Sequence, residues 1–246
     1  MTTPYEKNFH IPSSAVDRFD RMKPSFILDL MQEVAGAHSI LLGAGREDLQ
    51  KKGLFWAVIR HRVQITRLPA SGEDITVKTW PMPTTRTAYP RATVICDSDG
   101  RELVSAVSLW VLMNVGDRAM ILPGRSGVTV EGITLGCEIA APCSIVPKTY
   151  EASMDRTVRF SELDVNGHMN NCKYLDWVAD TLPGDFHKDH TPKEFTLCYL
   201  SEAREGEQIQ VSWELDEEGC LTVETGRKTG AVSSGHARVF SARMQF

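Results

Sequence analysis

Residues 67–77 read RLPASGEDITV, and residues 201–211 read SEAREGEQIQV. In both stretches a strand pattern leads into a turn of glycine and acidic residues, and the turn leads into a strand with alternating apolar residues. The two copies lie in opposite halves of the 246-residue chain. The sequence therefore predicts two units built to one plan.

The first unit is predicted to open with an irregular polar segment, followed by one long helix. Pro24 and Ser25 introduce this helix, and Gly43 and Gly45 end it. Apolar residues recur between them at helical spacing and form a broad stripe: Phe26, Ile27, Leu30, Met31, Val34, Ala35, His38, Leu41 and Leu42.

Alternating residues then predict a series of strands. In the clearest of them, one face is expected to carry Ala57, Ile59, His61, Val63 and Ile65. Residues 97–100 read DSDG, which is typical of a hairpin turn. The predicted strands of this unit span residues 57–66, 75–80, 91–96 and 103–115.

The second unit is predicted to repeat the plan. It should open with another irregular polar segment, and its helix should run over residues 171–182. Between the units, residues 124–147 are rich in Gly, Pro and Ser. We expect units at 1–125 and 149–246, a linker at 126–148, and an α+β fold with a shared sheet. The strands of the second unit are expected at residues 194–201, 208–215, 220–225 and 235–244.

Composition indicates a globular cytoplasmic protein. Apolar residues make up 42% and charged residues 24%, and no apolar run approaches the roughly 20 residues that span a bilayer. No signal peptide is visible. The net charge of −5 gives no attraction to nucleic acid. The six cysteines lack metal-ligand spacing, so we expect reduced thiols, no metal and no cofactor.

The candidate active site is residues 164–171, DVNGHMNN, which precede the second apolar helix pattern. In extended or turn backbone, residues two apart project to the same side, which would bring Asp164, Asn166 and His168 together. A carboxylate, a carboxamide and an imidazole so placed can move protons or polarise a carbonyl. An ordinary turn with a structural histidine is the alternative interpretation.

Several segments together resemble the acyl-acyl carrier protein thioesterases of the bacterial and plant type. The segments are residues 54–60 (LFWAVIR), 69–73 (PASGE), 75–80 (ITVKTW), 108–114 (SLWVLMN) and the motif from Asp164 to Trp177. The resemblance runs from about Tyr5 to Arg243. It implies a tandem hot-dog fold, in which each half wraps a curved antiparallel sheet around one long helix.

The resemblance also implies a catalytic set of Asp164, Asn166, His168 and, on a following strand, Glu202. We expect Glu202 to be the general base in a partly apolar site, although its polar surroundings in the sequence are also compatible with a solvated residue. Asn166, His168 and nearby backbone N–H groups would orient water or stabilise an oxyanion. A covalent acyl-enzyme through Asp164 or Glu202 is the alternative mechanism. Plant relatives often carry Cys after this Glu, whereas Ala203 stands here, which removes a thiol nucleophile.

By resemblance, the acyl chain lies in the N-terminal unit. We expect Met31, Val34, His38, Trp56 and Arg60 to bind the substrate, although a core role for His38 and Trp56 is the alternative. The carrier protein is acidic, so we expect it to dock on a local basic patch, for which the candidates are Arg60, Arg62, Arg67, Lys78, Arg86 and Arg91.

The predicted function is therefore hydrolysis of fatty acyl-carrier protein to free fatty acid, with acyl carrier protein as the partner and a homodimer as a possible assembly. The alternatives are a hot-dog thioesterase for coenzyme A esters and a non-catalytic acyl-binding module. A hot-dog dehydratase fits less well, because the thioesterase-like segments span both halves.

Overall fold

The computed structural model describes residues 2–134, 136, 138–150, 152–228 and 238–246. The chain divides into two compact units, Met1–Pro142 and Cys143–Phe246. The predicted unit boundaries and the linker at 126–148 stay a prediction. Among the described residues, no helix is both long and apolar enough to cross a membrane.

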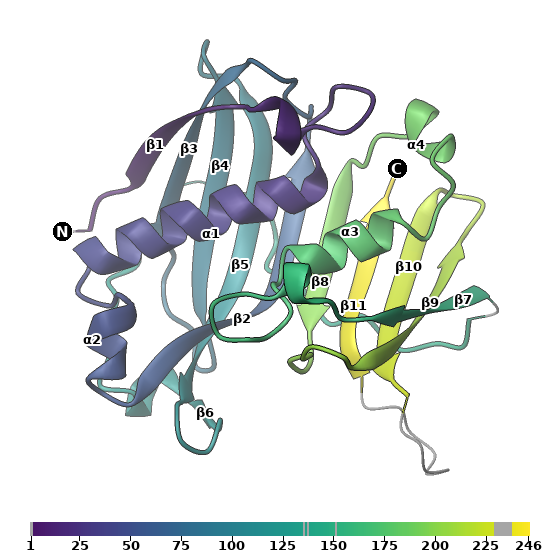
Figure 1. The fold of residues 1–246 in the computed structure, drawn as a ribbon. Coiled ribbons are helices and arrows are strands. Elements are labelled where there is room, and N and C mark those ends of the chain that lie inside the picture. Colours follow the sequence, from purple (N-terminus) through teal and green to yellow (C-terminus); the bar gives the residue numbers. More distant parts are fainter. Residues whose placement is uncertain (1, 135, 137, 151, 229–237) are drawn as a thin grey trace. The chain divides into compact units, whose positions relative to one another are not determined.

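Unit 1 is an antiparallel sheet with a long helix, α1 (Pro24–Leu41), across one face (Figure 1). Five strands are hydrogen-bonded in the order β1-β3-β4-β5-β2, and a short β6 pairs with β5. A short helix, α2 (Arg46–Gln50), follows α1. The strands are β1 (Tyr5–His10), β2 (Leu54–Ile65), β3 (Asp74–Pro81), β4 (Tyr89–Asp97), β5 (Glu102–Asn114) and β6 (Met120–Ile121).

The predicted long helix is confirmed by α1. Pro24 occupies its first turn, where a missing N–H is tolerated, and Gly43 follows its end with a φ of +67°, a backbone conformation that glycine adopts without strain. The predicted apolar stripe is buried over most of its length, including Val34 at 0% exposure. Leu41 was wrongly placed in that stripe, because it is 71% exposed at the end of the helix.

Strand β2 differs from its predicted pattern because it contains a β-bulge. Its register against β5 shifts between Val58 and Arg60. An extra residue on one strand reverses the inward and outward alternation beyond it. Val58 is therefore buried with His61 and Val63, whereas Ile59, expected on that face, is only half-buried.

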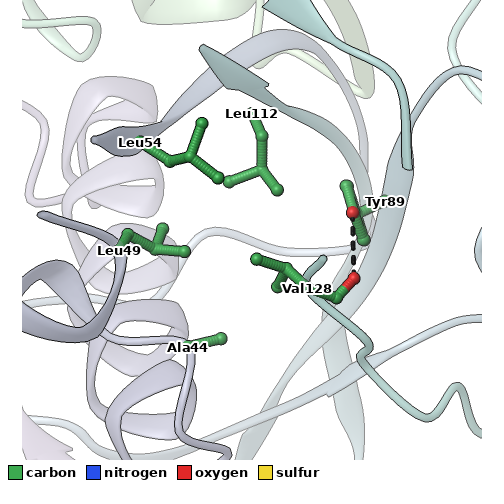
Figure 2. Close-up of a cluster of buried hydrophobic side chains, with 6 residues drawn as sticks. All are labelled: Ala44, Leu49, Leu54, Tyr89, Leu112 and Val128. Atoms are coloured by element: carbon green, nitrogen blue, oxygen red, sulfur yellow. Dashed lines mark hydrogen bonds between the residues drawn. The ribbon is translucent and has the colours of Figure 1, made fainter. Parts of the chain in front are cut away.

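One part of the unit 1 core lies where α2, β2 and β5 meet. Figure 2 shows its buried residues, and the hydroxyl of Tyr89 donates a hydrogen bond to the carbonyl of Val128 at 3.2 Å. Trp56 packs against this cluster, with its ring edge-on to Tyr89 and its indole N–H donating to the Ala44 carbonyl at 2.9 Å. The cluster consists of Ala44, Leu49, Leu54, Tyr89, Leu112 and Val128.

Unit 2 repeats the arrangement with a shorter helix. Its antiparallel sheet has the order β8-β11-β10-β9-β7, and α3 (Lys173–Ala179) crosses one face (Figure 1). A single-turn helix, α4 (Phe186–Asp189), precedes β8. The strands are β7 (Ala152–Thr157), β8 (Glu194–Tyr199), β9 (Gln208–Leu215), β10 (Cys220–Arg227) and β11 (Arg238–Gln245). Residues 235–237 of the predicted last strand lie outside the described residues.

Helix α3 is shorter than the predicted span of 171–182. At its start, the Asn170 side chain accepts a hydrogen bond from the Cys172 N–H at 3.0 Å in a turn that precedes the helix. At its end, the Thr181 hydroxyl bonds to the Val178 carbonyl, and Pro183 disfavours helical backbone in the residue before it. The helix is therefore limited to seven residues.

The prediction that each unit opens with an irregular polar segment is wrong, because each of these segments contains an edge strand. β1 pairs with β3, and β7 pairs with β9. Edge strands with one exposed face carry many polar residues, so the apolar alternation that predicts a strand is weak in them. With these strands in place, each unit has the hot-dog form that the resemblance implied.

Candidate active site

The predicted catalytic loop is a tight turn held together by the carboxylate of Asp164. Asp164 Oδ1 accepts hydrogen bonds from the backbone N–H groups of Asn166 at 2.8 Å and His168 at 3.2 Å. Its Oδ2 accepts from Asn166 Nδ2 at 3.1 Å. Gly167 has a φ of +75°, which suits glycine and closes the turn. Asp164 and Asn166 are thus brought together by a turn rather than by an extended backbone.

Glu202 and His168 meet through backbone pairing of two segments that are 34 residues apart in the sequence. The Met169 N–H donates to the Ala203 carbonyl at 2.8 Å, and His168 forms an antiparallel bridge with Arg204. This pairing places Glu202 Oε2 3.3 Å from His168 Nε2. Ala203 itself is fully buried beneath the pairing.

The surroundings of Glu202 differ from the partly apolar site that we predicted. Its side chain is 44% exposed, whereas that of His168 is 15% exposed. The carboxylate therefore has access to water, and the imidazole holds it in place from the buried side.

Arg227, at the end of β10, is a site residue that no sequence pattern predicts. Its guanidinium donates to the backbone carbonyl of Glu202, to Ser201 Oγ at 2.9 Å and to Glu207 Oε2 at 2.9 Å. One planar group thus holds both sides of the turn that carries Glu202. Nothing in the local sequence marks this arginine, because its partners lie 20 or more residues away.

The backbone N–H groups expected to stabilise an oxyanion already have partners inside the loop. The Gly167 N–H donates to the Asp164 carbonyl at 3.0 Å, and the His168 N–H donates to the Asp164 carboxylate. That part of the prediction is wrong, because a tight turn uses its own amide groups. The side chains of Asn166 and His168 are the remaining candidates.

The residues expected to bind substrate in unit 1 lie in different surroundings. Met31, Val34 and His38 are all buried on one face of α1, at exposures of 4%, 0% and 3%. Trp56 packs on the core cluster described above. Arg60 lies half-buried at the bulge of β2.

The predicted basic patch needs correction at Arg91. Its side chain is only 7% exposed, because β4 directs it to the α1 face of the sheet, so it cannot contact a docked protein. Arg67 forms a bidentate ion pair with Glu73 at 2.7 and 2.8 Å, and Lys78 pairs with Glu6 at 2.6 Å. Arg86 is exposed.

No cluster of three or more potential metal ligands occurs within the described ranges. Five of the six cysteines are described, and all five are free thiols: Cys96, Cys143, Cys172, Cys198 and Cys220. The site chemistry that the described residues offer is that of carboxylate, imidazole and carboxamide groups.

Comparison with known proteins decides the family. Residues 2–122 match the model of the acyl-ACP thioesterase N-terminal domain, and residues 147–239 match that of the C-terminal domain, where ACP is acyl carrier protein. The chain belongs to the acyl-ACP thioesterase family. His168 and Glu202 both lie within the part matched by the C-terminal domain.

Two plant members of the family illustrate the sequence similarity. A chloroplastic palmitoyl-acyl carrier protein thioesterase from Gossypium hirsutum is 27% identical over 221 residues, covering 84% of this chain and 54% of the relative. An oleoyl-acyl carrier protein thioesterase from Arabidopsis thaliana is 25% identical over 252 residues, covering 94% of this chain and 67% of the relative. The chain spans about half the length of several curated relatives that it matches.

Solved structures show the same fold. An acyl-ACP thioesterase from Bacteroides thetaiotaomicron superposes with a TM-score of 0.87 at 23% identity, covering 99% of this chain and 97% of the other. A 12:0-ACP thioesterase from Umbellularia californica gives 0.82 at 24% identity, covering 98% and 96%. The fold of this family member is therefore the tandem hot-dog.

A pH dependence of stability is expected from His38. Burial, with the nearby charge of Arg91, lowers the pKa of His38 to about 4. Its pKa in the unfolded chain is about 6.5, so between these values only the unfolded state takes up the proton. The contribution of His38 to the free energy of unfolding is therefore fully present above pH 6.5 and is lost as the pH falls towards 4. We expect the loss to be on the order of 1–3 kcal/mol.

The test is urea unfolding of wild type and His38→Gln at intervals from pH 7 to pH 4. Gln can still accept a hydrogen bond from Arg91 but does not titrate. The free energy of unfolding of the His38→Gln protein should therefore fall less than that of wild type over this pH range. His10→Gln, at an exposed histidine, is the control and should follow wild type. Parallel curves for wild type and His38→Gln would contradict the expectation.

Proposed function

We propose that this chain hydrolyses the thioester of fatty acyl-ACP, releasing a free fatty acid and the carrier protein with a free thiol. The observation that carries the proposal is the 3.3 Å approach of Glu202 Oε2 to His168 Nε2, beside a loop ordered by Asp164. Family membership supports the choice of a thioester as substrate.

In the proposed mechanism, Glu202 is the general base. A water molecule gives a proton to its carboxylate and attacks the acyl carbonyl carbon, which produces a tetrahedral oxyanion. The side-chain amide of Asn166 stabilises that oxyanion, while His168 orients the Glu202 carboxylate. When the C–S bond breaks, the proton held by Glu202 passes to the leaving thiolate. Water thus supplies the hydroxyl group of the fatty acid and the proton of the thiol.

The geometry favours Glu202 over Asp164 as the reacting carboxylate. Both oxygens of Asp164 accept hydrogen bonds from the loop, three in all. These bonds hold the carboxylate against its own turn and reduce its availability for attack on a carbonyl. Asp164 is therefore proposed to be a positioning residue, and a covalent intermediate through Glu202 is the alternative to activated water.

We further propose that the acyl chain binds on the sheet-facing side of α1, along Met31, Val34 and His38. The support is their common burial on one helix face, together with the predominantly apolar character of this helix. Trp56 and Arg60 remain predicted substrate contacts. A homodimer and a cytoplasmic location also stay predictions.

The decisive experiment is to incubate the protein with a panel of acyl-carrier proteins and to measure free fatty acid. The same acyl groups on coenzyme A form the second arm. We expect kcat/KM to be higher on the carrier protein. Higher values on coenzyme A would favour the alternative thioesterase, and no hydrolysis of either with measurable acyl binding would favour a binding module.

A further inference from the structure

A row of buried polar side chains crosses the sheet of unit 1. Arg91 on β4 lies opposite Ser108 on β5, which lies opposite His61 on β2. The neighbouring row begins with Thr79 on β3 opposite Thr93 on β4. All five are buried, at exposures between 0% and 7%. On the other side of the same strands, Trp80, Ala92 and Val94 form an apolar cluster, so the polar row is confined to one face.

That face is the one against α1. The imidazole of His38 lies 3.1 Å from Arg91 through its Nδ1, and the ring of Tyr5 stacks on it with a centroid distance of 5.8 Å. Because His38 is neutral at physiological pH, its Nδ1 can accept the hydrogen bond from Arg91.

Arg91 is a buried cation whose protein partners are all neutral. Burial lowers the pKa of Arg91 only to about 10, so the guanidinium stays charged at neutral pH. Nη1 provides both of its hydrogen bonds, to His38 Nδ1 and to Thr79 Oγ1 at 3.4 Å. Within the described part of the chain, no carboxylate lies at ion-pair distance from it. A buried charge without a counterion is strongly unfavourable, and proteins usually neutralise it.

The missing negative charge is the property that points to a ligand. A guanidinium presents its donors as a planar fork that matches the two oxygens of a carboxylate. Val34 and Met31 lie on the same face of α1 as His38, one and two turns before it respectively. An acyl chain along these residues would pass apolar side chains first and then reach His38, which lies about 10 Å from Met31 along the helix axis at 1.5 Å per residue, and the neighbouring Arg91.

We propose that Arg91, with His38 and Thr79, binds a carboxylate at the far end of the acyl group, so that the preferred substrate class is the ω-carboxyacyl thioester. This inference rests on the proposed function, because it assumes that the acyl group enters unit 1. Thr79 and His38 hold the guanidinium in place, while its Nε and Nη2 donors meet the carboxylate. A methyl-terminated chain of equal length leaves the charge without a partner.

The test compares two carrier-protein substrates with the same carbon number, one ending in a methyl group and one in a carboxylate. We expect wild type to have the higher kcat/KM on the ω-carboxyacyl substrate. Arg91→Met should lower the ratio of kcat/KM on the ω-carboxyacyl substrate to kcat/KM on the methyl-terminated substrate at least tenfold. The main cause should be slower hydrolysis of the ω-carboxyacyl substrate. Arg101→Met, at an exposed arginine of the same unit that lies outside the predicted docking patch, should leave the ratio unchanged. Arg91→Lys keeps the charge but not the fork and should lose most of the preference.

A second measurement does not depend on hydrolysis. A dicarboxylic acid of matching length should raise the Tm of wild type more than the monocarboxylic acid does, and Arg91→Met should abolish that difference. If wild type hydrolyses neither substrate but shows this shift, the proposed hydrolase function fails and the carboxylate site stands. Equal ratios and equal Tm shifts in wild type, Arg91→Met and Arg91→Lys would overturn the inference.

Discussion

Glu202→Gln is expected to lower kcat on acyl-ACP by about 100-fold or more, the usual contribution of a general base. The amide has the shape of the carboxylate but cannot accept a proton from water. The side chain is 44% exposed, so the exchange should leave Tm close to that of wild type. Steady-state kinetics together with thermal unfolding provides the measurement, and KM should change little.

Glu205→Gln is the matched control for this variant. Glu205 is an exposed carboxylate in the turn that follows Glu202, and its replacement should leave kcat within about twofold, as for surface changes away from a site. If Glu202→Gln kept more than a third of the activity, Glu202 would not be the base.

The second large effect is expected at Asp164. Asp164→Ala removes the acceptor for three hydrogen bonds that order the loop. The Asn166 amide and the His168 imidazole would then lose their placement, and a misplacement of about 1 Å can lower the rate about 100-fold. We expect kcat to fall by roughly 10- to 100-fold, with a stability loss of only about 0.5–1.5 kcal/mol, because the exposed donors of Asn166 can bond to water instead.

The Asp164→Asn variant distinguishes a positioning role of Asp164 from a role as a covalent nucleophile. Its Oδ1 can still accept from the backbone N–H groups of Asn166 and His168, so a positioning residue should retain part of its effect. A nucleophile would lose all activity in both variants, and mass spectrometry of wild type would then detect an acyl adduct on Asp164. Asp155→Ala, which breaks only an exposed ion pair with Lys228, is the control and should keep full activity.

Local patterns in the sequence were sufficient for the elements with strong periodicity. The α1 helix and strand β5 follow from apolar spacing, and the turn at Asp97 follows from its side-chain oxygen, which accepts from the N–H groups of Asp99 and Arg101. The edge strands β1 and β7 were not predicted, because their outer faces are polar. The bulge in β2 was not predicted either, since an extra residue is defined only by the register of the partner strand.

The loop of Asp164, Asn166 and His168 could be predicted from its own residues, because a turn with Gly167 needs no distant partner. The folded arrangement was needed to bring Glu202 to His168, to place Arg227 against the turn beside it, and to direct Arg91 towards α1 instead of solvent. Each of these contacts joins residues 20 or more apart in the chain, and each depends on how the segments that carry them pair. Side-chain direction across such a pairing follows the register, and the local order of residues carries too little information to define it.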